Sequence, residues 1–348
     1  MKIKQKLKKE LSQYSGLKNV VLFSSCRNAL YILLKSFELK STDEVIIQSF
    51  ICDSLPNAIR LAGGKPVSVD VDSRTLNLNA DSVKNKITPQ TKAVIFVHTY
   101  GNPSGIKEIA EICKKHNLIL IEDIAHALGA KCDGRLAGTF GDYAVYSFTK
   151  QMINFGGGAI LTNHNIDKIS LLRDQFRNKG SLLVYIKRLF ASLYETRAFF
   201  ISKILIDIAR KKSNLKQTND LDKHFHCTSI EAYLAFKQLP NLNDLILKKR
   251  KNHQFIQNKV NTQKILADCE ASHNYLSFIF NEDVESSVIT KTSFLFLPPW
   301  SGSNISNRII FMPNNLRFSL RKLKLMVANY HKIYNQTLII NKNGTKQL

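Results

Sequence analysis

The sequence predicts an α/β protein, with a large domain built on a mostly parallel sheet flanked by helices and a smaller α+β C-terminal domain. Two observations lead to this prediction. Up to about residue 165, short apolar runs alternate with stretches of helical periodicity, which is the pattern of βαβ units. Several runs are almost continuously apolar, as expected of strands covered on both faces. We therefore place the large domain at residues 1–225 and the small one at residues 226–348.

The first half of the chain supplies the strands of the predicted sheet. Residues 1–16 are basic and lack the apolar core of a secretory signal, so we expect an amphipathic first helix there. Helical patterns at 28–39 and 106–117 lie between strands. The predicted strands are residues 20–23, 44–49, 65–72, 92–100, 118–125, 143–148 and 158–163.

A basic helical insert is predicted at about residues 181–217. Charged residues such as Arg197, Lys203 and Asp207 interrupt its apolar character. It therefore lacks the run of about 18 apolar residues that could span a bilayer. Two interpretations remain open. The insert is either a helical hairpin packed on the body of the protein or an interfacial segment that rests on anionic lipid.

The last third of the chain has the pattern of a small α+β lobe that closes over a site on the large domain. A helix is predicted at 229–242, and strands such as 275–280 follow it. A polar basic stretch at 247–260 lies between them, and a final helix is predicted over about 319–335.

Net charge is the one unusual feature of the composition. The chain carries 50 Lys and Arg against 27 Asp and Glu, a formal charge of +23. Such a charge suits nucleic acid, an anionic membrane surface or a polyanionic small substrate, and a lysine-rich bias of a whole proteome would produce it too. The basic residues are spread along the chain without a nucleic-acid-binding motif, so nucleic acid is not expected as a partner.

The cysteines predict a reducing compartment. They show neither a C-x-x-C pair nor histidines at zinc-ligand spacing, so we expect reduced thiols, no metal site and a cytoplasmic protein. Peripheral contact with the inner face of the membrane is expected only if the insert at 181–217 binds lipid. The six cysteines are Cys26, Cys52, Cys113, Cys132, Cys227 and Cys269.

An acidic pair ends one of the predicted strands. Glu122 and Asp123 follow an apolar run, and His126 comes three residues after Asp123. Ligands of open parallel sheets bind at the carboxyl ends of the strands, so an acid there is well placed for chemistry. Asp123 could keep a pyridinium nitrogen protonated. The alternative is an acidic residue that only starts the next helix.

A lysine follows the next predicted strand along the chain. Lys150 lies just after residues 143–148 and before three glycines at 156–158. A lysine amine becomes a Schiff-base nucleophile when burial or positive neighbours lower its pKa, and glycines allow close backbone approach. Most lysines are instead solvated surface charges.

A polar turn at residues 24–30 precedes the first helical pattern of the large domain. Backbone N–H groups at a helix start bind phosphate, and Ser24, Ser25 and Arg27 could add donors. We place the helix start near Asn28. The alternative is a simple helix cap.

These features occur in the order used by PLP (pyridoxal phosphate) enzymes of the aspartate aminotransferase fold, and the chain resembles the DegT/DnrJ/StrS family of sugar aminotransferases. The resemblance runs from about residue 10 to about residue 335. Residues 41–50 resemble the family's GDEVIVPSF, residues 58–106 follow its pattern, and residues 121–148 match its block of conserved glycines and acids. It implies fold type I of the PLP-dependent enzymes.

The resemblance also implies roles for particular residues. Lys150 would form the Schiff base and Asp123 would pair with the pyridine nitrogen, and these are the expected catalytic residues. Several positions differ from the family pattern: Cys26-Arg27 replaces Gly-Thr, Cys52 replaces a stacking aromatic, and two histidines replace the Asn or Arg that reaches the phosphate of the neighbouring subunit. The expected cofactor-binding residues are Cys26, Arg27, Cys52, Asp123, His126, Ser147, Lys150, His224 and His226.

The activity implied by the resemblance is amino transfer from an amino acid, expected to be glutamate, to a nucleotide-linked keto-sugar. Such enzymes serve the biosynthesis of lipopolysaccharide and other surface polysaccharides and work as homodimers with the site at the subunit interface. Two alternatives remain open. One is a PLP-dependent sugar dehydratase, against which Lys150 argues. The other is a catalytically silent regulatory relative that binds anions or membrane.

Overall fold

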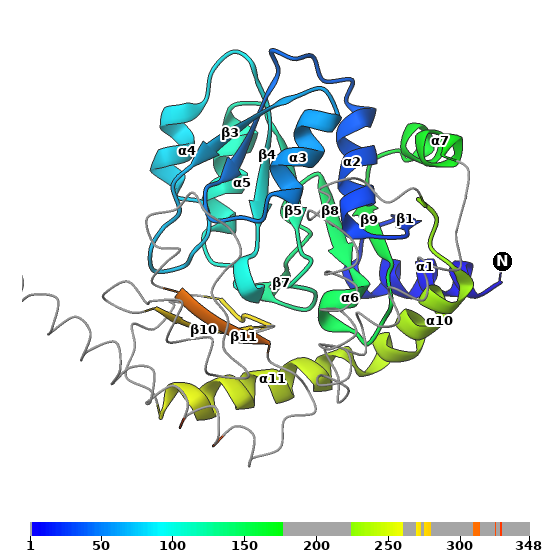
Figure 1. Cartoon of the computed structure of the whole chain (residues 1–348), viewed down its shortest axis with the longest axis vertical. Helices are drawn as coiled ribbons and strands as arrows, with labels where there is room; N and C mark the ends of the chain where they lie inside the picture. The colour runs from blue at the N-terminus through cyan, green and yellow to red at the C-terminus, as the bar shows by residue number, and fades with distance from the viewer. Residues whose placement is uncertain are drawn as a thin grey trace, which may run out of the picture.

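A seven-stranded sheet forms the centre of the molecule (Figure 1). The computed structural model describes residues 2–176, 224–259, 269–272, 275–279 and 309–313, together with Lys324 and Ala328. The strand order is β1-β9-β8-β5-β4-β2-β3. The strands are β1 (Asn19–Phe23), β2 (Glu44–Gln48), β3 (Lys65–Val69), β4 (Thr91–Val97), β5 (Ile119–Asp123), β8 (Tyr143–Ser147) and β9 (Gly158–Thr162).

Strand direction confirms the predicted mostly parallel sheet. From β3 to β8, each strand pairs in parallel with its neighbour. Strand β9 is the exception, because it runs antiparallel to both β1 and β8. The remaining six strands consequently point the same way, and their carboxyl ends meet at one edge of the sheet.

Helices cover both faces of the sheet. Side chains alternate between faces along a strand, so Val45 and Ile47 join one core while Ile46 joins the other. The first face carries α2 (Cys26–Ser36), α3 (Ser54–Leu61) and α7 (Asp167–Gln175). The second carries α1 (Lys2–Ser15), α4 (Ala80–Lys86), α5 (Ile106–Lys115) and α10 (Ser229–Gln238) (Figure 1).

Helix α1 is the amphipathic first helix that the sequence predicts. Its Leu7 and Leu11 are fully buried and belong to the same core as Ala232 and Ala235 of α10. The predicted domain boundary at residue 225 therefore lies just before a helix that packs on the large domain. The division into two domains stays a prediction.

The described residues after 224 are mainly helical. Helix α10 and the short η2 (Leu239–Asn241) lead into α11 (Leu242–Gln257), which includes most of the basic stretch at 247–260. The predicted strand at 275–280 is confirmed as β10 (Tyr275–Ile279), which pairs antiparallel with β11 (Ile309–Pro313).

Two predicted segments lie wholly or mostly outside the described residues. The basic insert at 181–217 lies outside the described residues. Of the final helix at 319–335, only Lys324 and Ala328 are described, and both are helical. Among the described residues, no helix combines the length and the apolar character needed to cross a bilayer.

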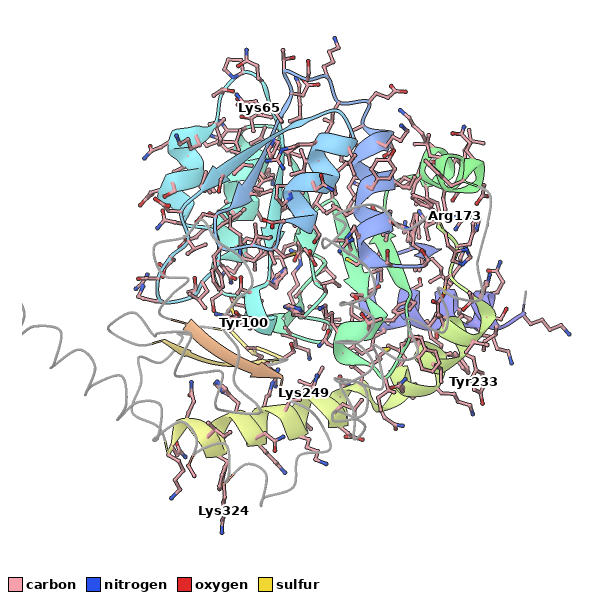
Figure 2. The ribbon with its side chains drawn as sticks, viewed as in Figure 1. Lys65, Tyr100, Arg173, Tyr233, Lys249 and Lys324 are labelled. Carbon is pink, nitrogen blue, oxygen red and sulfur yellow. A yellow bond between two sulfur atoms is a disulfide. The ribbon has the colours of Figure 1, made fainter. Side chains whose placement is uncertain are left out.

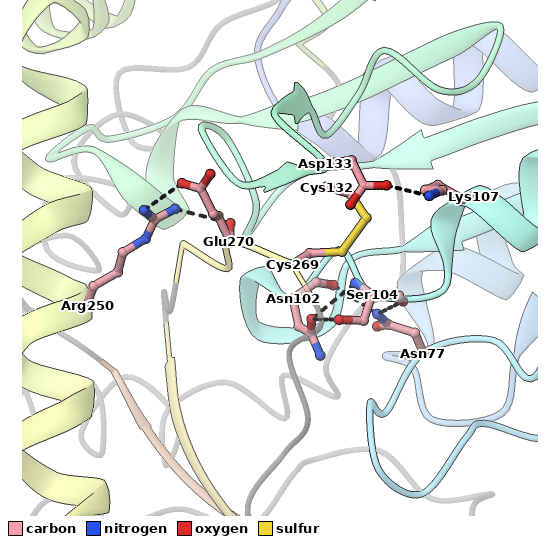
Figure 3. The surroundings of a disulfide bond; sticks show 9 residues. All are labelled: Asn77, Asn102, Ser104, Lys107, Cys132, Asp133, Arg250, Cys269 and Glu270. Carbon is pink, nitrogen blue, oxygen red and sulfur yellow. Dashed lines mark hydrogen bonds and ion pairs between the residues drawn. A yellow bond between two sulfur atoms is a disulfide. The ribbon is translucent and has the colours of Figure 1, made fainter.

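A disulfide between Cys132 and Cys269 corrects the expectation that all six cysteines are reduced thiols (Figure 3). Cys132 belongs to the small hairpin of β6 (Lys131–Cys132) and β7 (Arg135–Leu136). Cys269 lies 137 residues further along the chain. Sequence spacing carries no information about so distant a pair, which is why the expectation was wrong. Backbone hydrogen bonds between Lys131 and Glu270, with N···O distances of 2.9 and 2.7 Å, join the same two segments.

The disulfide should contribute to stability under oxidising conditions. Replacing both cysteines, Cys132→Ser with Cys269→Ser, should lower the free energy of unfolding by about 2–4 kcal/mol, because the unfolded chain regains the freedom of a long loop. Denaturant unfolding with and without reductant measures this. Reductant should destabilise the wild type and a Cys52→Ser control, and leave the double variant unchanged. A wild type insensitive to reductant would contradict the bond.

Gly158 permits the close contact between β9 and the start of α2. A Cβ there would lie 2.6 Å from the Cys26 nitrogen and 2.8 Å from the Tyr146 carbonyl oxygen. We expect Gly158→Ala to lower stability by about 2–3 kcal/mol, since backbone atoms cannot move aside cheaply. The control is Gly105→Ala, whose methyl meets no atom within 4 Å. Gly105→Ala should lower the free energy of unfolding by about 1 kcal/mol, because Gly105 has a positive φ. Equal denaturant midpoints for the two variants would contradict the expected effect of the close contact at Gly158.

Candidate active site

The carboxyl edge of the sheet gathers most of the residues that the sequence singled out. Asp123 ends β5, Ser147 ends β8, and the 24–27 turn follows β1. The short helix η1 (Thr99–Gly101) follows β4 at the same edge. Parallel strands bring these four segments together, although they are far apart in the sequence.

Asp123 lies at the centre of this group. Its Oδ1 accepts a hydrogen bond of 2.9 Å from the Ala125 backbone N–H. Burial raises the pKa of the carboxyl, whereas this hydrogen bond and the charges of His98 and Lys150 act in the opposite direction. The carboxylate form of Asp123 therefore depends on positively charged neighbours.

Lys150 lies in the one-turn helix α6 (Phe148–Gln151), directly after β8. Its charge acts on Asp123, His126 and Cys26, so the ammonium group is within electrostatic range of all three. Gln151 fixes this helix, because its side chain accepts from the Leu128 N–H at 2.7 Å and donates to the Leu128 carbonyl at 3.0 Å. These two bonds join α6 to the loop that carries His126.

His126 and Tyr100 place two nearly parallel rings beside this group. Their centroids are 6.4 Å apart and the planes differ by 14°. Burial lowers the pKa of His126 well below its usual value, and the charges of Lys150 and Lys249 lower it further, so the imidazole is neutral. The Ser272 hydroxyl donates to the His126 carbonyl at 2.7 Å, which fixes the loop.

Tyr100 was not among the residues predicted from the sequence. It lies at the lower edge of the sheet as drawn in Figure 2, and only 5% of its surface is exposed. Its backbone has φ +54°, a left-handed conformation that is unfavourable for a side chain with a Cβ. The Thr99 side chain secures this turn through a 2.8 Å bond to the Leu76 carbonyl. Such strain is common at functional sites.

The turn before α2 differs from its prediction. The helix begins at Cys26, two residues before the expected start, because Ser25 is the N-cap and its side chain accepts from the Asn28 N–H at 3.2 Å. Ser24 is fully buried and its hydroxyl donates to the His224 carbonyl. The Ser24 proton is therefore engaged, whereas Ser25 only accepts in its bond and can still donate its O–H, so Ser25, the backbone of the first helical turn and Arg27 remain as candidate phosphate donors.

A hydroxyl pair at the end of β8 adds a group that the sequence analysis missed. Ser147 and Thr149 have their hydroxyl oxygens 3.1 Å apart. Ser147 was a predicted cofactor-binding residue, whereas Thr149 was not. Thr149 lies only two residues after Ser147, the last residue of the strand, and this closeness in the sequence could have indicated it.

Of the two site cysteines, Cys26 lies within electrostatic range of Asp123, and Cys52 lies within that range of Cys26. Burial raises the pKa of the Cys26 thiol well above its usual value, and the carboxylate of Asp123 and the sulfur of Cys52 raise it further. Cys26 is consequently a protonated thiol. Cys52 is exposed, and its sulfur lies 2.9 Å from the Ser54 hydroxyl.

The two predicted histidines lie in different surroundings. His224 is buried, and its carbonyl accepts from Asn28 Nδ2 at 2.9 Å within the same chain. His226 Nε2 lies 3.8 Å from Asp174 Oδ1, and burial lowers the pKa of this histidine, aided by Arg173. The cross-subunit role implied for both remains a prediction.

Lys249 brings a buried amine from α11 toward His126. It shares the inward face of the helix with apolar residues such as Ile246 and Ile256, and it is 4% exposed. Figure 2 shows it between α11 and the sheet. Burial lowers the pKa of Lys249 from 10.5 to about 8. Its position among apolar residues on one face of the helix was a sign in the sequence that this lysine is buried.

The Lys249 amine should make stability depend on pH. The folded pKa is about 8 and the unfolded value 10.5, so the unfolded chain binds more protons between these values and stability rises with pH there. Lys249→Met should therefore gain up to about 3 kcal/mol relative to the wild type at pH 7, and lose most of this advantage by pH 10. Urea unfolding across this range measures it. Lys248→Met, at an exposed neighbour, should show no such trend; a pH-independent difference for Lys249→Met would contradict the interpretation.

Known proteins resemble this chain in both sequence and fold. Residues 2–291 match the DegT/DnrJ/EryC1/StrS aminotransferase family. A GDP-perosamine synthase of Caulobacter vibrioides is 37% identical over 171 residues, covering 48% of this chain and 46% of that protein. The spore coat polysaccharide biosynthesis protein SpsC of Bacillus subtilis is 30% identical over 245 residues, covering 68% of this chain and 62% of that protein. The chain spans about half the length of the curated relatives that it matches.

The fold agrees over a longer stretch. The Helicobacter pylori aminotransferase PseC superposes with a TM-score of 0.74 at 18% sequence identity, covering 97% of this chain and 92% of that one. Such a likeness supports the PLP-dependent fold type I and the predicted architecture. The sequence match extends over most of the chain. The protein therefore belongs to the DegT/DnrJ/EryC1/StrS aminotransferase family.

Proposed function

We propose that this protein is a PLP-dependent aminotransferase that moves an amino group from an amino acid, with glutamate as the expected donor, to a nucleotide-linked keto-sugar. One observation carries the proposal. Lys150 lies within electrostatic range of both Asp123 and His126 at the carboxyl edge of the sheet, in a member of an aminotransferase family. Carboxyl edges of parallel sheets are where such folds bind their ligands.

The groups at this edge fit the chemistry of PLP. The Lys150 amine would hold its aldehyde carbon, Asp123 would face the pyridine nitrogen, and His126 would lie beside the ring. The first turn of α2 and the Ser147–Thr149 hydroxyl pair would bind the phosphate, because helix starts and hydroxyls donate to anions. When bound, PLP supplies an electron sink for amino transfer.

Asp123 would hold the proton on the pyridine nitrogen. Burial raises the pKa of its carboxyl, so the carboxylate needs positive partners. A protonated ring nitrogen would add such a partner through a charge-assisted hydrogen bond. The acid and the ring nitrogen would thus stabilise each other's charged form.

Lys150 would transfer protons between carbon atoms during amino transfer. Its Nζ would take the proton from the α-carbon of the amino donor and return one to the carbon that receives the nitrogen. The Gln151 bonds to Leu128 keep α6 in place, so the amine retains its reach toward His126 and Asp123. The neutral His126 adds no charge that would compete with these transfers.

Two considerations support a nucleotide-linked sugar as acceptor. Relatives carry names such as GDP-perosamine synthase and UDP-N-acetyl-3-dehydro-alpha-D-glucosamine 3-aminotransferase. The net charge of +23 also favours substrates that carry phosphate groups. A role in surface polysaccharide synthesis would follow from such a product.

Two aromatic rings would offset the departure from the family pattern at Cys52. Cys52 cannot stack on a cofactor ring, but the Tyr100 and His126 rings lie at the same edge of the sheet. These rings would supply the aromatic surface that the Cys52 position lacks. A homodimer in the cytoplasm, with the site completed at the subunit interface, belongs to the same proposal.

Lys150→Ala provides the direct test. The wild type, mixed with PLP and freed of excess cofactor, should keep a visible absorbance band, and the variant should lose that band together with at least about 10³-fold of its amino transfer from glutamate, because covalent attachment and proton transfer both disappear. Spectroscopy and a coupled assay with nucleotide-linked 3-keto and 4-keto sugars measure the two effects.

The control is Lys114→Ala, at an exposed position on α5. It should retain both the band and the activity. A wild type that binds no PLP would refute the proposal, and so would full transfer activity in Lys150→Ala. Loss of water from the sugar without nitrogen transfer would instead identify a dehydratase.

A further inference from the structure

Four residues, 269–272, form a short strap that lies beside the small hairpin of β6 and β7. Cys269 is bonded to Cys132 through the disulfide, and the backbones of Glu270 and Lys131 exchange two hydrogen bonds. The first two residues of the strap are therefore attached to the hairpin, one of them covalently.

Helix α11 also holds the strap. Arg250 donates from Nε to the Ala271 carbonyl at 2.9 Å. It also donates from Nη1 to Glu270 Oε2 at 3.0 Å and from Nη2 to the Glu270 carbonyl at 3.2 Å (Figure 3). A planar guanidinium that makes three such bonds fixes the backbone that it contacts. The last residue of the strap, Ser272, therefore follows a backbone that is already held in place.

Ser272 connects the strap to the two turns that carry the aromatic rings of the site. Its backbone N–H donates to the Gly101 carbonyl at 2.9 Å, and its hydroxyl donates to the His126 carbonyl at 2.7 Å. Gly101 directly follows Tyr100, so the two bonds join the η1 turn to the loop of residues 124–129. Ser272 is fully buried, so water has little access to either donor.

The η1 turn is fixed independently of the strap. The Thr99 N–H donates to Asn77 Oδ1 at 3.0 Å, and Asn77 Nδ2 donates to the Asn102 carbonyl at 2.9 Å. These bonds hold the backbone on both sides of Tyr100. The turn is thus a rigid reference, and Ser272 fixes the second ring-bearing loop relative to it.

The same loop has a second attachment, on the side of α6. Gln151, next to Lys150, exchanges two hydrogen bonds with the Leu128 backbone. Gln151 therefore sets the place of this loop relative to Lys150, whereas Ser272 sets its place relative to Tyr100. The position of the loop's imidazole in the site depends on both attachments.

We propose that Ser272 is a positioning residue for the amino-transfer site, whose hydroxyl fixes the imidazole of His126 where PLP binds. This inference rests on the proposed function, in which His126 lies beside the cofactor ring. Ser272 acts through His126 and takes no part in proton transfer. Without the hydroxyl bond, the loop would occupy its binding-competent position for only a fraction of the time, and the apparent dissociation constant of PLP would rise by the reciprocal of that fraction.

Ser272→Ala tests the proposal, because it removes the hydroxyl but keeps the backbone N–H that binds Gly101. The dissociation constant of PLP, followed by absorbance on the apoprotein, should rise about fivefold, as expected if the loop is correctly placed about one fifth of the time. Amino transfer should return to nearly the wild-type rate at saturating PLP, since the bound cofactor selects the correct position. Lys150→Ala should not recover in this way.

A double-mutant cycle shows whether Ser272 acts through the His126 imidazole. His126→Ala removes the ring and leaves the carbonyl to which Ser272 donates. In that background, Ser272→Ala should change the PLP dissociation constant by less than about twofold, because the ring that it positions is already absent. A purely structural role would instead reproduce the full effect seen with His126 present.

The matched control removes a buried hydroxyl at the opposite edge of the sheet. Thr162 is fully buried, and its Oγ1 donates to the Asp142 carbonyl at 2.6 Å. It pairs with Tyr143, the first residue of β8, so it lies away from the strand ends that form the site. Thr162→Val and Ser272→Ala should both lower the urea midpoint of the apoprotein, but Thr162→Val should leave the PLP dissociation constant unchanged.

The outcomes separate this inference from the proposed function. If the wild type binds no PLP, the proposed function fails. If the wild type binds PLP, the inference is wrong when Ser272→Ala binds it equally well, when its effect is the same in the His126→Ala background, or when Thr162→Val weakens binding as much. Should Ser272→Ala fail to fold, Ser272→Gly, which also lacks the hydroxyl, takes its place in the same cycle.

Discussion

The common direction of β4, β5 and β8 is the constraint on which the site depends. Because these strands are parallel neighbours, the segments that follow them must emerge at one edge, and Asp123, Ser147 and the η1 turn become neighbours. The reversed strand β9 adds the glycines at the same edge, since its amino end lies beside the carboxyl end of β8. Gln151 then joins α6 to the His126 loop, which fixes Lys150 relative to the acid.

The second feature of this edge of the sheet is a set of buried titratable groups. Burial shifts the pKa of Asp123 upward and those of His126 and Lys249 downward, in each case toward the neutral form. The neighbouring Glu122 side chain is held by hydrogen bonds, since its oxygens lie 2.9 Å from His98 Nε2 and accept from the Gly138 and Gly141 N–H groups. Titratable groups whose pKa values are shifted by burial and by neighbouring charges are common at functional sites.

The sequence predicted those features that depend on local pattern. The seven central strands and the first helix follow from apolar periodicity, and Asp123 was found because it ends a strand. The start of α2 was misplaced because Ser25 caps the helix earlier than the apolar pattern begins. The Cys132–Cys269 disulfide, like the His98–Glu122 pair, joins segments whose proximity is set by tertiary packing, so no spacing rule could reveal them. The basic insert at 181–217 remains a prediction.

The packing of α1 against α10 has a consequence for protein synthesis. Leu7 and Leu11 are synthesised before Ala232 and Ala235, which share their core and are added more than 200 residues later. At about 5–20 residues per second, the apolar side of α1 waits for roughly ten seconds or more before its permanent partner exists. The nascent chain must therefore shelter the apolar side of that helix until α10 has been synthesised.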